Sequence, residues 1–193
     1  VLIPVPYYVS YPEIVKIAGG VPIFVEGDKN NFLKPKYENL ESSITDKTKM
    51  LVLCNPNNPT GAVLNRQELE KIAQIALKYK ILILVDEIYE KLVFDNRKFC
   101  SFASIDSELK KYTILVNGVS KSFCMTGWRL GFVASNSEII NAINILQSHQ
   151  TGNTSSITQH AALKAYQSAH EFTIYLREEF EERRNLFYDL LIK

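Results

Sequence analysis

Two cationic side chains, Lys121 and Arg129, lie close together in the segment 117–132, which reads Asn-Gly-Val-Ser-Lys-Ser-Phe-Cys-Met-Thr-Gly-Trp-Arg-Leu-Gly-Phe. Lys121 lies in a polar stretch that follows an apolar, strand-like run. A lysine amine that is partly shielded from water can act as a nucleophile and form a Schiff base with an aldehyde. An arginine guanidinium presents a rigid fork that suits a phosphate. The pair therefore predicts a site for a cofactor that has both an aldehyde and a phosphate.

Four residues elsewhere in the chain have the chemistry that an aldehyde-bearing pyridine ring would need. An ionised Asp86 would pair with a protonated ring nitrogen and keep the ring an electron sink. The Asn58 amide and the Tyr89 hydroxyl can donate hydrogen bonds to the phenolate oxygen of such a ring. Tyr8 provides a flat aromatic face for stacking.

The lysine loop offers two further functions. The hydroxyl of Ser120 could donate a hydrogen bond to the phosphate. Once a substrate amine has displaced it, Lys121 would be a free base that moves a proton between the substrate α-carbon and the cofactor. Taken singly, these residues also have plain structural interpretations, since an aspartate after a strand is commonly a turn or capping residue and a tyrosine commonly a packing residue. Their combination favours catalysis.

Alternating strand and helix signals predict the fold that positions these residues. Apolar runs predict strands at 1–5, 21–25, 50–54, 81–85, 113–116 and 128–134. Amphipathic spacing predicts helices at 10–18, 37–44, 66–77, 88–92, 137–149, 157–167 and 171–193. This order predicts an α/β fold with a mostly parallel sheet sandwiched by helices, and the short connection to the last strand predicts that this strand is antiparallel.

Three patterns predict where particular helices begin. Ser10 with Glu13 and Asn65 with Glu68 each have the form of a capping box, in which each side chain accepts a hydrogen bond from the backbone N–H of the other residue. Asn136 has the chemistry of an N-cap residue before the next long helix.

The topology predicts where the chemical groups meet. In α/β sheets, ligands bind beyond the carboxyl ends of the parallel strands. Five candidates lie at or just past such a strand end, and we expect them to converge at one edge of the sheet: Tyr8, Asn58, Asp86, Tyr89 and Lys121.

Composition excludes several classes of partner. The chain has 22 basic and 21 acidic residues, a net charge of +1 and no run of like charges, so neither nucleic acid nor an anionic membrane is an expected partner. No apolar run is long enough to cross a bilayer and no signal peptide is recognisable, which predicts a cytoplasmic location. The three cysteines lack metal-ligand or disulfide spacing, so we expect no metal and assign the cysteines to packing.

Three motifs, in this order, resemble the class I and II aminotransferases of the fold-type-I pyridoxal-phosphate enzymes. They are Asn-Pro-Asn-Asn-Pro-Thr-Gly at 55–61, Asp-Glu-Ile-Tyr at 86–89 and Ser-Lys-Ser-Phe-Cys-Met-Thr-Gly-Trp-Arg-Leu-Gly at 120–131. The resemblance extends across essentially the whole chain and is nearest to bacterial and archaeal aspartate aminotransferases of the shorter type. It implies the large domain of that fold, pyridoxal 5'-phosphate as the cofactor, and transfer of an amino group from aspartate or a similar amino acid to 2-oxoglutarate.

The resemblance also implies a role for individual residues. These roles are Lys121 as the Schiff-base lysine, Asp86 as the partner of the pyridine nitrogen, Tyr89 and Asn58 as partners of the phenolate oxygen, Arg129 as a phosphate ligand and Tyr8 as the stacking ring. We therefore expect Lys121, Asp86 and Tyr89 to be catalytic. Asn58 and Tyr8 are expected to contact the substrate as well as the cofactor.

Two positions depart from the family pattern. Tyr8 stands where the nearest relatives often have tryptophan, which preserves stacking but leaves the substrate less defined. Gly118 stands where many relatives have a phosphate-binding serine, so fewer phosphate contacts are expected on this side.

The ends of the chain predict a piece of a longer protein, because it begins in an apolar run and stops within a helical pattern. We expect residues 1–170 to form the cofactor-binding large domain, incomplete at its N-terminal side, and residues 171–193 to begin a long helix leading to a C-terminal small domain. By the resemblance, the glycine-rich phosphate loop lies upstream, the carboxylate-binding arginine lies downstream, and a homodimer partner supplies a tyrosine. The piece alone is therefore not expected to transaminate at a useful rate.

Other functions remain compatible with these motifs. A carbon–sulfur β-lyase of the same fold would release pyruvate and ammonia from a cysteine conjugate. An aminotransferase-like sensor domain of a transcription regulator would bind the cofactor without turnover. A purely structural protein would not bind the cofactor at all.

Overall fold

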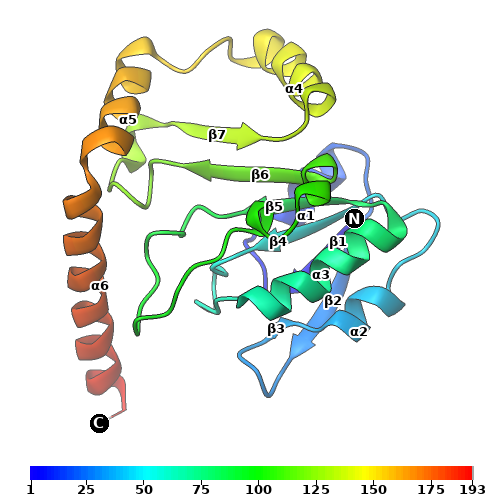
Figure 1. The fold of residues 1–193 in the computed structure, drawn as a ribbon, viewed down its shortest axis with the longest axis horizontal. Coiled ribbons are helices and arrows are strands. Elements are labelled where there is room, and N and C mark those ends of the chain that lie inside the picture. The colour runs from blue at the N-terminus through cyan, green and yellow to red at the C-terminus, as the bar shows by residue number, and fades with distance from the viewer. Residues whose placement is uncertain (193) are drawn as a thin grey trace.

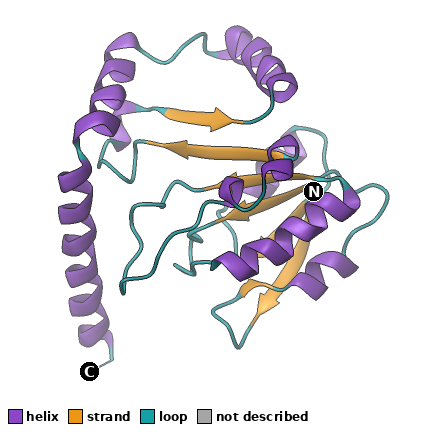
Figure 2. Cartoon of the chain, in the orientation of Figure 1, coloured by secondary structure: helices purple, strands orange, loops and turns teal. Residues whose placement is uncertain are grey.

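The computed structural model describes residues 1–192 and contains a seven-stranded sheet with helices on both faces (Figure 1). Figure 2 distinguishes the strands, helices and loops. The strands are β1 (Leu2–Val5), β2 (Ile23–Asp28), β3 (Lys34–Pro35), β4 (Met50–Cys54), β5 (Leu82–Asp86), β6 (Thr113–Gly118) and β7 (Gly131–Ala134). The helices are α1 (Ser10–Ile17), α2 (Tyr37–Ser42), α3 (Arg66–Tyr79), α4 (Ser137–Gln150), α5 (Ser156–Ser168) and α6 (His170–Leu191). Among these described helices, none combines the length and apolar character that a membrane crossing requires.

The strands are arranged in the order β3-β2-β1-β4-β5-β6-β7. Neighbouring strands from β2 to β6 are parallel, whereas β3 pairs antiparallel with β2 and β7 pairs antiparallel with β6. The predicted mostly parallel sheet and its antiparallel last strand are therefore confirmed. Within this register Cys54, the last residue of β4, lies beside Asp86, the last residue of β5.

The larger hydrophobic core lies between one face of the sheet and helices α2 and α3, and α3 is visible in front of the sheet in Figure 1. Leu51 and Leu53 belong to this core from β4, and Leu69 and Ile72 join it from α3. All four side chains are at most 2% exposed. Burial of a side chain of this size stabilises the fold by about 1.5–3 kcal/mol.

A smaller core lies on the opposite face. Because side chains alternate along a strand, Val52 faces away from Leu51 and Leu53 and packs with Ile3 of β1 and Val15 of α1. This helical layer is thinner than the first, since α1 is the helix that contributes to it.

Helix α6 is fastened to the loop that follows β5. The guanidinium of Arg184 donates two hydrogen bonds to the Asp95 carboxylate, at 2.9 and 2.7 Å, and its carbon lies 5.1 Å from the centre of the Phe94 ring. The backbone N–H of Asp95 donates to Glu181 at 2.8 Å. These contacts hold α6 along the side of the sheet, as Figure 1 shows. Residue 193, the end of the predicted last helix, lies outside the described residues.

Two predicted strands begin two or three residues later in the structure, and one predicted helix does not form. The strand predicted at 21–25 is β2 and begins at Ile23, because Pro22 has no N–H to donate to the sheet. The strand predicted at 128–134 begins at Gly131, because Arg129 has a left-handed backbone with φ of 53° and ends a short 3-10 helix at Thr126–Trp128. The helix predicted at 88–92 is wrong, since its backbone hydrogen bonds are the isolated turns from Glu90 to Glu87 and from Leu92 to Tyr89.

One of the two predicted capping boxes forms. The Asn65 side chain accepts a hydrogen bond from the Glu68 N–H at 2.9 Å, and the Glu68 carboxylate accepts from the Asn65 N–H at 2.7 Å. At α1 the prediction is wrong, because Val9 already has helical dihedral angles and Ser10 lies inside the helix without a capping bond. The expected cap at Asn136 is confirmed by its bond from the Ile139 N–H.

The carboxylate of Glu87 is buried directly after β5. Its side chain accepts hydrogen bonds from the Ser101 hydroxyl at 3.1 Å and from the Phe102 N–H at 2.8 Å, and the residue is 1% exposed. Burial raises the pKa of the Glu87 carboxyl to about 7, although both hydrogen bonds act in the opposite direction. Glu87 therefore links the end of β5 to the loop before β6 and favours the neutral form.

The two capping patterns give a first prediction. Replacing Asn65 with Ala should lower the free energy of unfolding by about 1 kcal/mol, because the Glu68 N–H loses its acceptor. Ser10→Ala is the matched control and should change stability by less than about 0.5 kcal/mol, since the Ser10 hydroxyl makes no capping bond. Urea unfolding of both variants measures the difference, and equal losses would contradict this assignment.

A second prediction concerns the pH dependence of stability. A folded-state pKa of about 7 against an ordinary value of 4.5 means that Glu87 favours the folded state fully below the ordinary value and loses this contribution as pH rises through 7. Relative to wild type, Glu87→Gln should gain on the order of 3 kcal/mol between about pH 5 and about pH 8, because its amide cannot ionise. Unfolding at both pH values tests this. Exposed Glu108→Gln should show no such gain, and a Glu87 variant that behaves like it would refute the burial argument.

Candidate active site

A pocket of about 460 Å³ opens at the carboxyl ends of the parallel strands. All the residues that the sequence singled out line it: Tyr8, Asn58, Asp86, Tyr89, Ser120, Lys121 and Arg129. Six of them follow β1, β4, β5 or β6 or end a strand, as the edge rule requires. Arg129 reaches the same edge because β7 runs in the opposite direction and therefore begins there.

The lysine loop connects β6 and β7 and is closed by its own hydrogen bonds. The Val119 N–H donates to the Leu130 carbonyl at 3.4 Å, next to the first paired residues of the two strands. The Thr126 hydroxyl donates to the Ser120 carbonyl at 3.1 Å. These bonds hold the half-buried Lys121 at the top of the hairpin.

The interior side chains of the same loop attach it to α5. Val119 and Phe123 form a small buried cluster with Ala162, and Tyr166 packs edge-on against Phe123 with ring centres 4.9 Å apart. The lysine loop is therefore stabilised by packing against α5 as well as by its own hydrogen bonds.

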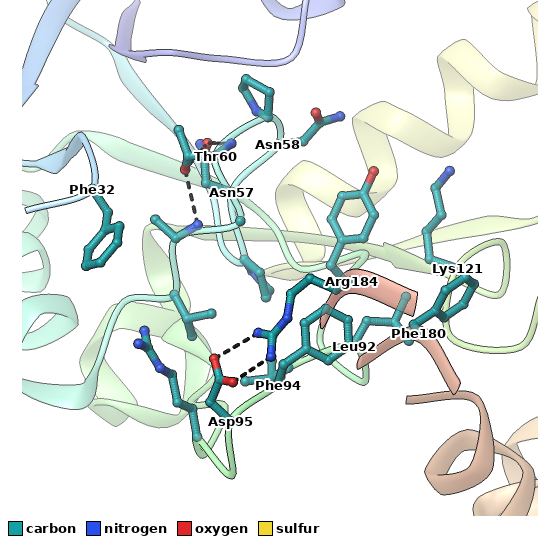
Figure 3. A pocket seen from close by; sticks show the side chains of 18 of the residues that line it. Phe32, Asn57, Asn58, Thr60, Leu92, Phe94, Asp95, Lys121, Phe180 and Arg184 are labelled. Atoms are coloured by element: carbon teal, nitrogen blue, oxygen red, sulfur yellow. Dashed lines mark hydrogen bonds and ion pairs between the residues drawn. The ribbon is translucent and has the colours of Figure 1, made fainter. Parts of the chain in front are cut away.

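Lys121, Tyr89 and Asn58 meet on one side of the pocket. The Lys121 Nζ lies 5.8 Å from the centre of the Tyr89 ring. Burial, followed by the nearby Cys54 and Asp86, raises the pKa of the Tyr89 hydroxyl, whereas a hydrogen bond with Asn58 lowers it. Tyr89 is thus a protonated donor at neutral pH. In Figure 3, Asn58 and Lys121 extend toward the same end of the cavity, away from the Asp95–Arg184 pair.

Asp86 has both carboxylate oxygens engaged. Oδ2 accepts a hydrogen bond from the Tyr11 hydroxyl at 2.9 Å, and Oδ1 accepts one from the Ile88 N–H at 3.1 Å. Each oxygen retains a second lone pair, so the carboxylate can still accept a hydrogen bond from a ligand in the pocket. The carboxylate is therefore oriented before any ligand binds.

Arg129 and Ser120 add two further groups of hydrogen-bond donors to the pocket. The Arg129 guanidinium uses Nη1 for a bond to the Thr126 carbonyl at 3.1 Å, and its other N–H groups can bind an anion. Gly118 permits the close approach of β7, because a Cβ at this position would lie 2.8 Å from the Leu130 carbonyl oxygen. A side chain in place of Gly118 would therefore require the hairpin to open.

Tyr11 and Cys54 also line the pocket and were not expected there. The signal for Cys54 was available, since it ends β4 and so obeys the edge rule that selected Asp86. Cys54 is buried, as its packing assignment predicted, whereas Cys124 is exposed and does not follow that assignment. Tyr8 precedes α1, Tyr11 lies in its first turn, and the two rings contact each other in the lining of the pocket.

A second cavity of about 890 Å³ adjoins the first and shares Asn58, Tyr89 and Lys121 with it. Its remaining wall comes from the 56–63 loop, the 92–97 loop and α6. Figure 3 shows Thr60 and Phe32 on one side of this cavity and Phe180 on the other. This second cavity is larger, but only the smaller pocket is lined by all three of Lys121, Asp86 and Tyr8.

The donor set of the smaller pocket suits an aromatic ring that has an aldehyde, a phenolic oxygen and a phosphate. An amine, a fixed carboxylate, an amide with a phenol, and a guanidinium with a hydroxyl face the same space. Tyr8 is 44% exposed, so part of its side chain is accessible to a ligand.

Comparison with known proteins identifies the family. The family model described as "Aminotransferase class I and II" matches residues 1–193. An aspartate aminotransferase of Bacillus sp. (strain YM-2) is 49% identical over 191 residues, which are 99% of this chain and 49% of that protein. An asparagine–oxo-acid transaminase of Streptococcus mutans is 42% identical over 193 residues, which are 100% of this chain and 49% of that protein.

The fold agrees with this similarity. The crystal structure of an aromatic aminotransferase from Pyrococcus horikoshii OT3 matches 97% of this chain and 51% of its own with a TM-score of 0.94 at 38% identity. The chain spans about half the length of the curated relatives that it matches. The expected fold-type-I architecture is confirmed, and the chain belongs to the class I and II aminotransferase family.

Proposed function

We propose that this chain is the cofactor-binding part of a pyridoxal-phosphate-dependent aminotransferase. The observation on which this rests is the convergence of Lys121, Asp86 and Tyr8 on one pocket from three separate parts of the sequence. The bound cofactor supplies an electron sink for a substrate carbanion. The side chains of this chain bind it, orient it and move protons.

Lys121 has two tasks in this proposal. Its Nζ binds the cofactor aldehyde as a Schiff base, and once released it moves a proton at the substrate α-carbon. Tyr89 and Asn58, which lie beside it, donate to the phenolic oxygen of the cofactor. The raised pKa of Tyr89 keeps this donor protonated at neutral pH.

The other groups hold the ring at its remaining positions. Asp86 pairs with the ring nitrogen, and the exposed face of Tyr8 stacks on the ring. Arg129 and Ser120, which also line the pocket, bind the phosphate. Because Gly118 provides no side chain there, these two residues are the phosphate donors that the chain itself contributes from the lysine loop.

The proposed reaction transfers an amino group from aspartate or a similar amino acid to 2-oxoglutarate. Two relatives are named for aspartate and for asparagine, and a third structure is named an aromatic aminotransferase. Aspartate is favoured because of the higher identity of the relative named for it, and 2-oxoglutarate rests on the family resemblance. Asn58 and Tyr8 are the residues of this chain placed to contact the substrate. The β-lyase and sensor-domain alternatives gain no support from these names.

We further propose the organisation of the whole protein. Residues 1–170 form its cofactor-binding large domain, and residues 171–193 begin the helix that leads to a small domain. The exposed apolar side chains of Phe187, Leu190 and Leu191 on α6 support such a continuation, since each is more than 60% exposed. The full-length protein is proposed to be a cytoplasmic homodimer, as in the family it resembles.

A third prediction tests Lys121 in the full-length protein. Wild type incubated with pyridoxal phosphate should show a visible absorbance band and become irreversibly labelled at Lys121 on borohydride reduction, because reduction fixes the Schiff base. Lys121→Ala should show neither and should lose at least about a thousandfold in kcat, since it lacks both the nucleophile and the base. Lys71→Ala, an exposed lysine of α3, is the matched control and should behave like wild type. A labelled lysine elsewhere would contradict this assignment.

A fourth prediction concerns the isolated 193-residue chain. Incubated with pyridoxal phosphate, aspartate and 2-oxoglutarate, it should produce glutamate at no more than about one-thousandth of the rate of a full-length relative, because a site lacking its substrate-binding arginine and phosphate loop loses binding and orientation. The measurement is a coupled glutamate assay with the full-length enzyme as reference. Turnover close to the reference would refute the proposal that residues 1–193 hold only part of the site.

A further inference from the structure

The first turn of α1 brings one tyrosine into contact with two groups of the pocket. The hydroxyl of Tyr11 donates a hydrogen bond to Oδ2 of Asp86 at 2.9 Å across a sequence separation of 75 residues. The ring of Tyr11 also packs edge-on against the ring of Tyr8, with centres 5.6 Å apart and planes at 78°. Tyr11 thus contacts both the carboxylate and the aromatic ring that face the proposed cofactor.

The Tyr11 bond completes the fixation of Asp86. The Ile88 N–H holds only Oδ1, at 3.1 Å, and a carboxylate held at one oxygen can still turn about its terminal bond. A second donor on Oδ2 removes this freedom. The donors come from different elements, since Ile88 follows β5 and Tyr11 belongs to α1.

The environment of Tyr11 keeps its hydroxyl a donor. Burial, followed by the neighbouring Cys54 and Asp86, raises the pKa of the Tyr11 hydroxyl far above its ordinary value. The phenol therefore retains its proton at neutral pH. Its acceptor in the pocket is the carboxylate of Asp86.

We propose that Tyr11 is a positioning residue that holds Asp86 in the orientation needed to pair with the cofactor ring nitrogen and that supports the stacking ring of Tyr8. This inference rests on the proposed function and concerns how its site is built. The hydroxyl acts through Asp86, and the ring acts through Tyr8. Loss of the hydroxyl alone should therefore loosen the pairing at the ring nitrogen while the stacking contact remains.

A similar tyrosine–carboxylate bond outside the pocket provides a control. The Tyr37 hydroxyl donates to the Glu41 carboxylate at 3.0 Å, and neither residue lines the pocket. Tyr37→Phe therefore removes a comparable hydrogen bond without touching the site. A general structural effect of losing such a bond should appear in both variants.

The experiment compares four variants of the full-length protein with wild type: Tyr11→Phe, Asp86→Asn, the double variant and Tyr37→Phe. The Kd for pyridoxal phosphate is measured by equilibrium dialysis. The pH midpoint of the visible absorbance band is measured by titration of the bound form. Melting of the cofactor-free proteins shows whether each variant folds.

Tyr11→Phe should weaken cofactor binding about threefold to tenfold, because a hydrogen bond that orients a charged partner is lost. It should also raise the pH midpoint of the absorbance band by about half a unit or more, since a less firmly paired ring nitrogen withdraws less charge from the Lys121 linkage. In the Asp86→Asn background the same change should alter the Kd by less than about twofold, because Tyr11 then has no carboxylate to orient. Tyr37→Phe should leave both quantities unchanged.

Two results would overturn the inference while leaving the proposed function intact. One is a Tyr11→Phe variant with the Kd and midpoint of wild type. The other is an undiminished effect of Tyr11→Phe in the Asp86→Asn background, whether or not the variants melt early, because the hydroxyl would then not act through Asp86. A wild-type protein without any visible band would instead refute the proposed function itself, and with it the basis for a positioning role.

Discussion

The alignment of the carboxyl ends of the parallel strands is the constraint on which the site depends. Hydrogen bonding places Cys54 at the end of β4 beside Asp86 at the end of β5. The loops that follow these two strands therefore begin side by side at the same edge of the sheet. A shift by one residue would turn the Asp86 side chain to the other face of the sheet and exchange it with Glu87. That exchange would replace an oriented carboxylate with one that is buried among Ser101 and Phe102. The hydrophobic alternation of Leu51, Val52 and Leu53 specifies this register, because only one register buries both cores.

The hairpin of β6 and β7 adds what parallel strands alone do not provide. Parallel strands contribute one loop each to the site, whereas an antiparallel partner returns the chain to the same edge within a few residues. Lys121 and Arg129 therefore reach one pocket from a single connection. The close approach of Gly118 to Leu130 keeps this connection tight. The hydrogen bonds donated by the Val119 N–H and the Thr126 hydroxyl then limit how far the backbone of this connection can move.

The sequence was sufficient for the parts of the fold that depend on local patterns and on topology. Apolar runs located the parallel strands, and the edge rule brought Asp86 and Lys121 together although they are far apart in the chain. Features set by backbone geometry were not accessible in the same way. The box at Ser10 did not form because Val9, whose side chain cannot act as a cap, occupies the N-cap position of α1. The left-handed backbone conformation of Arg129 makes β7 begin later than predicted. An arginine at this position gives no sequence signal for such a conformation.

Tyr11 was missed for a related reason. Its function depends on a long-range contact with Asp86, and a tyrosine in a first helical turn has no sequence signal that distinguishes it from a packing residue. The contact exists because α1 lies over the end of β5 after the chain leaves β1. The sequence predicts the helix at this position, but it does not predict how α1 is rotated about its own axis, and this rotation decides which side chains face Asp86. A residue that acts through another residue is thus harder to infer than one that faces the ligand directly.

The charges of the pocket separate cofactor recognition from substrate recognition. Within residues 1–192 the smaller pocket contains two cations, Lys121 and Arg129, and both are assigned to the cofactor. Of the further cations that line the adjoining cavity, Lys34 is paired with Glu68, Arg183 with Glu179 and Arg184 with Asp95, whereas Arg97 forms no salt bridge among the described residues. A dicarboxylic substrate needs positive charge that is not already neutralised. Together with the ion pairs of Lys34, Arg183 and Arg184, this requirement leaves Arg97 as the cation of the two cavities, within the described residues, that is neither paired nor assigned to the cofactor.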